Sequence, residues 1–313
     1  MNDLLFSLNA VLPVFLVMGA GYLLARLHVF TAPFVEKGNS LCFQVFLPVL
    51  LFYNIASSDF TASFDAKTVL YGVGGTLLLC GVLSAAVPLF VKDNARRGVM
   101  VQGMFRSNFL LLGVPLCTRL AGEDGMLAAS VMSAFLIPTY NLLATVVLAR
   151  YAFKEKPRAG EVAKKVLLNP LIIASALGLA FSLLRVPIPQ AVNAALADVS
   201  GIATPFALMM LGAGFEFKAV TRNIAAIATV LSVKLIAAPA LLLAVAAMLG
   251  FKGTGYAVLL CAFGTPIAVS SYVMALRENG DGELACHLVV LTSVFSSLTM
   301  FGLVYVSRLL GLL

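Results

Sequence analysis

The sequence predicts an all-α membrane protein in which ten transmembrane helices form two inverted five-helix repeats. Composition gives the class, because 61% of the 313 residues are hydrophobic, 11% are charged and the mean hydropathy is +1.02. Soluble domains contain roughly 45–50% apolar residues. Apolar segments of about 20 residues, the length that crosses a bilayer, recur along the whole chain. Two of these segments carry the same interruption at matching places, which indicates the repeat.

The first repeat, residues 1–150, contains five expected spans. No basic segment precedes the first one, so we expect a retained helix and not a cleaved signal peptide. The third contains Gly72, Gly74 and Gly75, small residues that let helices pack closely in lipid. The basic loop 151–165 that follows this repeat is too short to bury a core of its own. The five spans are 4–27, 40–57, 68–91, 101–120 and 126–149.

The second repeat, residues 166–313, follows the same plan. When residues 202–217 are laid over 46–60, Pro205 falls on Pro48 and Glu216 on Asp59, which is weak but correctly placed internal similarity. Since each repeat has an odd number of spans, the two repeats must have opposite topology. The spans are 166–184, 199–214, 224–249, 257–276 and 284–306.

Two spans, one in each repeat, carry a Gly-x-Pro triplet that we expect to break the helix. Span 101–120 contains Gly113 and Pro115, and span 257–276 contains Gly264 and Pro266. A proline has no amide for the carbonyl four residues earlier. Inside a bilayer, freed backbone groups are tolerated only where they are buried in protein or line a cavity. Broken spans at matching places in the two repeats therefore predict a transporter binding site.

The basic residues predict the orientation of the spans. Fourteen of the 21 Lys and Arg residues lie in links on one side of the membrane and five on the other side. The remaining two, Arg106 and Lys234, lie within spans. Because cytoplasmic links carry the excess of positive charge, both termini are expected on the non-cytoplasmic side.

This orientation places several polar residues near the middle of the membrane. At a rise of 1.5 Å per residue, Arg106 lies roughly 12 Å deep, Asn108 roughly 15 Å and Lys234 roughly 16 Å, and a bilayer core is about 30 Å thick. Pro266 reaches about the same depth as Asn108. The predicted substrate-binding residues are Asn108, Ser107, Ser270, Ser271, Lys234, Asn54, Asn141 and Arg106.

Each of these residues also has a structural interpretation. A buried lysine can snorkel to the interface or bond to the carbonyls of a broken helix, and Arg106 could reach cytoplasmic water. The asparagines and serines could form hydrogen bonds between helices, worth about 0.6–2 kcal/mol. The sequence leaves open whether Lys234 contacts substrate or steadies the crossover.

The polar residues near the midplane are cationic or neutral, because no Asp or Glu lies deep in any span. Half-helix amino termini also favour anions, so we expect a small anionic substrate. The five scattered cysteines show no metal-ligand spacing, and neither a cofactor nor a nucleic-acid partner is needed to explain the chain. A secondary transporter of organic anions is the leading interpretation, and an uncoupled anion uniporter or channel is the alternative. No nucleophile–base pair indicates an enzyme.

The segment SNFLLLGVPL at 107–116 resembles the broken fourth helix of the auxin efflux carrier family. This family includes the plant PIN-type auxin carriers and bacterial permeases described for malate or malonate, and the resemblance covers essentially the whole length. Asn108 matches the asparagine of the plant motif, and Ser107 replaces its proline. In the ninth span Pro266 fits the first of two prolines and Ser271 stands where the second would be.

The resemblance implies a bacterial inner-membrane carrier with a sodium/bile-acid-symporter-like fold, in which helices 4 and 9 cross. It further implies a homodimer in membrane lipid. Spans 1, 2, 6 and 7 would form a scaffold domain, and spans 3–5 and 8–10 a transport domain that moves like an elevator. Dicarboxylates or auxin-like acids are the implied substrates. The breaks could centre on Asn108 and Ser271, or on the two Gly-x-Pro triplets; the depth argument favours Asn108 in one helix and Pro266 in the other.

Overall fold

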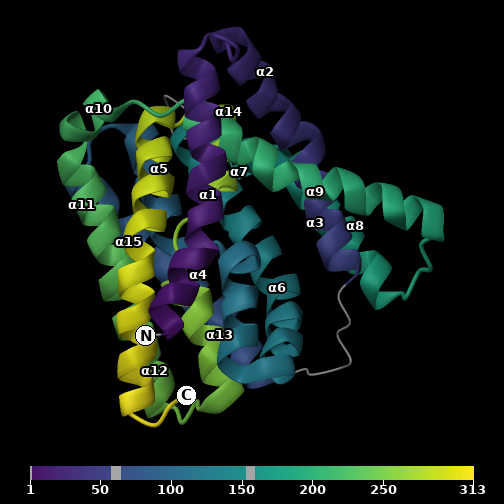
Figure 1. Cartoon of the computed structure of the whole chain (residues 1–313), viewed down its shortest axis with the longest axis vertical. Coiled ribbons are helices and arrows are strands. Elements are labelled where there is room, and N and C mark those ends of the chain that lie inside the picture. The colour runs from purple at the N-terminus through teal and green to yellow at the C-terminus, as the bar shows by residue number, and fades with distance from the viewer. Residues whose placement is uncertain (1, 58–64, 153–158) are drawn as a thin grey trace.

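The computed structural model describes residues 2–57, 65–152 and 159–313, and all regular secondary structure in these ranges is helical (Figure 1). Asp59 and residues 153–158 of the basic loop lie outside the described residues. The helices are α1 (Asn2–Arg26), α2 (Ala32–Leu41), η1 (Cys42–Phe46), α3 (Leu47–Ala56), α4 (Ala66–Phe90), α5 (Asn94–Phe105), η2 (Phe109–Gly113), α6 (Val114–Ala152), α7 (Ala159–Leu167), α8 (Pro170–Leu183), α9 (Gln190–Ala213), α10 (Phe217–Arg222), α11 (Ile224–Ser232), η3 (Val233–Ala237), α12 (Ala238–Met248), α13 (Gly253–Gly264), α14 (Ser270–Arg277) and α15 (Gly282–Leu309).

Among the described residues, six helical segments are long and apolar enough to cross a membrane. They are Ala32–Ala56, Ala66–Phe90, Asn94–Ala152, Gln190–Ala213, Ile224–Met248 and Gly282–Leu309, and shorter apolar helices occur at Phe15–Arg26, Pro170–Leu183 and Gly253–Gly264. Large apolar side chains such as Leu70, Leu89 and Met248 point outward, with exposures of 72%, 86% and 85%. An outer surface of this kind suits contact with lipid chains. The chain is therefore a multi-pass membrane protein.

Three wide, π-helical turns in the described residues allow helices to continue through prolines. Each of η1, η2 and η3 is followed by one residue and then a proline, namely Pro48, Pro115 and Pro239. In each case the amide just after the wide turn donates to the carbonyl five residues earlier, as Val114 N does to Phe109 O. Such a turn lets the helix continue past a residue that has no amide to give.

This geometry corrects the prediction that Gly113 and Pro115 interrupt the fourth span. Both residues lie in continuous helix, because η2 runs directly into α6. The break lies earlier, between the end of α5 at Phe105 and the start of η2 at Phe109. The sequence of the break, Arg106 to Asn108, contains no proline or glycine. In the ninth span the break follows Gly264 and includes Pro266.

The chain reverses direction inside the segment Val114–Ala152, which is helical at both ends. Ala121 and Gly122 leave helical geometry there, and Gly122 has a φ of +65°. Glycine adopts this left-handed conformation without steric cost. The reversal joins the helical segment that begins at Val114 to the one that ends at Ala152.

The helices pack in two groups. In the first, α9 packs against α1 and α3, and α3 also packs against α8. Glycines bring α1 and α9 close: a Cβ on Gly21 would lie 2.1 Å from Met209 O, and one on Gly212 would lie 1.9 Å from Met18 O. The second group places α13 against α6 and α12, and α5 against α4, α6 and α15. Both chain ends lie toward the same end of the molecule (Figure 1).

Candidate functional site

The two broken spans meet at a backbone hydrogen bond. Asn108 N donates to Pro266 O over 2.7 Å. Arg106 has extended geometry (φ −82°, ψ 131°), as does Thr265 (φ −67°, ψ 152°), so both chains are unwound where they cross. The ends of four helices, α5, η2, α13 and α14, therefore meet at one place.

Arg106 is a buried cation on the side of the crossover that faces a cavity, which we call the front. Its side chain is 4% exposed and lines a cavity. Nη2 donates to Asn141 Oδ1 at 2.6 Å and to Ser270 Oγ at 2.7 Å, and Nη1 donates to Met274 Sδ. Its Nε has no hydrogen-bond partner. All the partners are neutral, so nothing among the described residues compensates the guanidinium charge.

Lys234 is a buried cation on the side of the crossover away from the cavity, which we call the back. It lies in η3, is 2% exposed, and donates to Ser107 Oγ and to Phe263 O, the latter at 3.2 Å. The amide that would bond to Phe263 O in a continuous α-helix, Ile267 N, is instead bonded to Thr292 Oγ1 at 3.3 Å. Lys234 thus bonds to the carbonyl that the break leaves free, and it is not among the residues that line the cavity.

The cavity at the front of the crossover has one wall that holds charged and polar groups among apolar residues, and one wall that is apolar apart from Thr204. It offers about 70 Å³ to the centre of a water molecule. The wall formed by the broken spans and α6 holds the polar residues Arg106, Ser107, Asn108, Tyr140, Asn141 and Ser270, together with the apolar residues Phe109, Leu110, Leu111, Ile137, Ala268 and Val269. The opposite wall comes from α3, α8 and α9 and contains Leu47, Leu50, Leu51, Leu171, Thr204 and Ala207. The cavity therefore lies between the two packing groups.

The cavity brings together five of the predicted residues: Arg106, Ser107, Asn108, Asn141 and Ser270. Asn54 on α3 and Ser271 on α14 do not line it, and the buried Oγ of Ser271 has no hydrogen-bond partner. Gly113, Pro115, Gly264 and Pro266 do not line it either.

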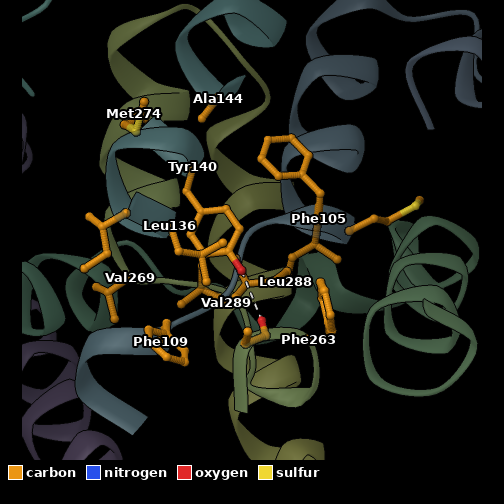
Figure 2. Packing of buried hydrophobic residues seen from close by; sticks show 14 of the residues in the cluster. Phe105, Phe109, Leu136, Tyr140, Ala144, Phe263, Val269, Met274, Leu288 and Val289 are labelled. Carbon is orange, nitrogen blue, oxygen red and sulfur yellow. Dashed lines mark hydrogen bonds between the residues drawn. The ribbon is translucent and has the colours of Figure 1, made fainter. Parts of the chain in front are cut away.

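Sequence reasoning missed Tyr140 and Thr204. Tyr140 precedes Asn141 and donates its hydroxyl to Ala262 O over 3.0 Å; Figure 2 shows it among Phe105, Phe109 and Phe263. A tyrosine beside a predicted site residue was a signal that could have been used. Thr204 lies next to Pro205, which the internal repeat had already marked.

The described residues around the crossover offer no cluster for a metal ion. No group of three or more His, Cys, Asp or Glu side chains occurs among them, and the five free cysteines are buried. Ion pairs in this part of the chain lie at helix ends, Arg96 with Asp281 and Arg222 with Glu283. A ligand of the cavity would thus meet one cation, neutral polar groups and an apolar wall.

Comparison with known proteins shows the family to which the chain belongs. Residues 6–304 match the family described as "Membrane transport protein". An "Uncharacterized transporter" of Methanothermobacter thermautotrophicus is 23% identical over 303 residues, which cover 94% of this chain and 96% of the relative. A "Putative malonate transporter" of Rhizobium meliloti is 24% identical over 306 residues, which cover 95% of each chain. Since the family match spans nearly the whole sequence, the chain belongs to the membrane transport protein family, which is the auxin efflux carrier family that its fourth span resembles.

Proposed function

We propose that this protein carries small organic anions, with dicarboxylates such as malonate as the leading substrate class, across the cytoplasmic membrane. The observation that carries the proposal is Arg106, a buried guanidinium that lines the crossover cavity and has only neutral partners. An unpaired charge inside a membrane is costly, and such residues mark substrate or ion pathways. A carboxylate is the natural ligand for the planar donor fork of arginine.

The neutral groups beside Arg106 suit the same ligand. Asn108 lines the cavity at the start of η2, where helical amides and the helix dipole favour negative charge. Ser270 lies at the start of α14 and offers a hydroxyl. A carboxylate between these residues would accept hydrogen bonds from both broken spans.

The size of the cavity favours small acids. A space of about 70 Å³ is several times the roughly 10–15 Å³ that a single water molecule needs, so the cavity can hold more than one water. A three- or four-carbon dicarboxylate is of this order, whereas an acid with an indole ring needs the cavity to widen. The relative from Rhizobium meliloti, named for malonate, supports the same class.

The two walls of the cavity support an elevator-type mechanism. We infer that α1 to α3, α8 and α9 form the scaffold, and that the remaining helices form a transport domain that moves the crossover across it. The wall on the scaffold side is apolar apart from Thr204, so Leu47, Leu50 and Leu171 can slide past the polar groups without breaking hydrogen bonds of their own. The proposal includes the ten-span inverted repeat, a homodimer joined through the scaffold, and termini on the non-cytoplasmic side.

A matched pair of ligands tests the charge of the substrate. Malonate and its neutral diamide, malonamide, have nearly the same shape and differ in charge. We expect malonate to raise the melting temperature of the purified protein and to be taken up by proteoliposomes, and malonamide to do neither. Stabilisation and uptake of the diamide in preference to malonate would refute the proposal.

A further inference from the structure

A second cavity, of about 320 Å³, opens where α7, α8 and the end of α14 come together. Lys164, Asn169 and Arg277 line it, together with one acidic residue, Glu278. Arg277 also lines a wider cavity, of about 610 Å³, between α2, α9 and α14. Arg277 thus lines both cavities at this end of the molecule, the end where Figure 1 shows α2, α7 and α14.

The two cations of this cavity are free to act on a solute. Lys164 and Arg277 are exposed, and neither has a hydrogen-bond or ion-pair partner among the described residues. Other arginines at this end are engaged: Arg96 bonds to Asn223, and Arg222 to Glu283. Glu278 carries the one opposite charge in the lining, so the two cations leave the cavity with a net positive charge, which raises the local concentration of anions.

A buried polar connection leads from this cavity to the crossover. Asn169 is 4% exposed, and its Nδ2 donates to Thr145 Oγ1 over 3.0 Å. Thr145, which is fully buried, donates in turn to Asn141 O over 2.8 Å. The side chain of Asn141 accepts from Arg106. Asn169, Thr145 and Asn141 therefore form a chain of hydrogen bonds from one cavity to the other, and Thr145 and Asn141 lie one turn apart on α6.

We propose that the cavity at Lys164 and Arg277 is the entrance through which anions reach the crossover site from this end of the molecule. The proposal rests on the anion-carrier function and deepens it by assigning the route. Lys164 and Arg277 attract the anion, and Asn169 marks where the route passes from α8 to α6. The cations act by steering, so they control the rate at which an anion arrives.

Thiol labelling tests the route without reference to the natural substrate. Ser270→Cys places a reporter in the crossover cavity, and Thr204→Cys places a second one on the opposite wall in case the first variant folds poorly. The five native cysteines are buried, so the unmodified chain is the blank. The probes are an anionic and a cationic methanethiosulfonate reagent, sulfonatoethyl and trimethylammonioethyl, and the measurement is the ratio of their labelling rates.

We expect Lys164→Gln combined with Arg277→Gln to lower the anionic-to-cationic ratio about 10-fold at low ionic strength, and less in high salt. Lys252→Gln, a change of the same kind beside the C-terminal segment, should leave the ratio unchanged. An equal ratio in the double variant and in the Lys252 control would overturn the proposed route. A second measurement tests the proposed function by itself: malonate should slow labelling of the reporter cysteine. If malonate does not slow labelling, although the double variant still lowers the ratio, the proposed substrate class is rejected and the proposed route stands.

Discussion

The front and the back of the crossover each hold one buried cation, and the two differ in what they bond to. Arg106 donates to side-chain atoms of Asn141, Ser270 and Met274 and lines a cavity. Lys234 donates to the main-chain carbonyl of Phe263 and to Ser107 and lies away from the cavity lining. We infer that the charge of Arg106 serves a ligand, whereas the charge of Lys234 serves the fold. The comparison makes opposite predictions for binding and for stability.

The largest effect is expected for Arg106→Gln. Loss of one partner of a buried charge pair costs about 2–5 kcal/mol of binding, which is about 30-fold or more in the Kd for malonate. Removal of an uncompensated buried charge should leave the melting temperature of the ligand-free protein unchanged or higher. Isothermal titration and thermal unfolding measure the two quantities.

Lys37→Gln, at an exposed position, is the matched control for Arg106. It should change neither quantity. A fall in the ligand-free melting temperature of Arg106→Gln with the Kd for malonate intact would reverse the roles assigned to the two cations.

Lys234→Met should act mainly on stability. The substitution leaves Phe263 O and Ser107 Oγ without their buried donor, at about 1–3 kcal/mol for each unsatisfied group. We expect a lower melting temperature in detergent, while the folded fraction still responds to malonate. Lys234→Arg keeps a donor and should recover part of the loss. If Lys234→Met is as stable as the parent protein but no longer binds malonate, the back of the crossover belongs to the binding site.

Asn108→Ala should weaken malonate binding about 10-fold, because a hydrogen bond to a charged ligand contributes about 1.5 kcal/mol. The backbone bond from Asn108 N to Pro266 O does not need the side chain, so the crossover should stay intact. Titration of the variant with malonate checks the first point and its melting temperature the second. A large fall in melting temperature without a change in Kd would contradict a ligand role for this side chain.

The smallest effects separate two neighbouring serines. Ser270→Ala removes an acceptor of Arg106 that lines the cavity, and should cost about 1 kcal/mol of malonate binding. Ser271→Ala removes a buried hydroxyl without a hydrogen-bond partner, so binding should be unchanged and stability equal or slightly higher. Parallel titrations of the two variants measure the difference. Equal losses of binding would mean that both serines face the ligand.

Much of the crossover could be predicted from the sequence, because a charge or an asparagine in an apolar span is conspicuous. Arg106 and Asn108 belong to one break and Asn141 to α6, and the sequence alone did not show that these two elements meet. Asn54 looked equivalent to Asn141, yet it does not line the cavity. In a chain that is apolar on all sides, periodicity does not tell which way a side chain faces.

Proline was the least reliable of the sequence signals. Pro266 lies within a break, whereas Pro115 is carried by a helix with a wide turn, and the break before it contains neither proline nor glycine. Whether a helix breaks at a proline depends on whether neighbouring helices offer hydrogen-bond partners to the backbone amides and carbonyls that the break leaves free. Lys234 and Thr292, which take up such groups in the ninth span, lie in other spans and could not be matched to it from sequence alone.

The wide turns also have a rotational consequence. Each residue of an α-helix advances the chain by about 100° around the helix axis. A turn with one extra residue therefore rotates the side chains on one side of the turn by about 100° around that axis, relative to those on the other side. The wide turns η1, η2 and η3 each stand just before a proline, so each proline is linked to a rotation of one helical segment relative to the next. This rotation helps to decide which side chains point inward in Leu47–Ala56, in the segment before Val114 and in the segment before Ala238. By this reasoning the angular position of Asn108 depends on a proline two turns away that never touches the cavity.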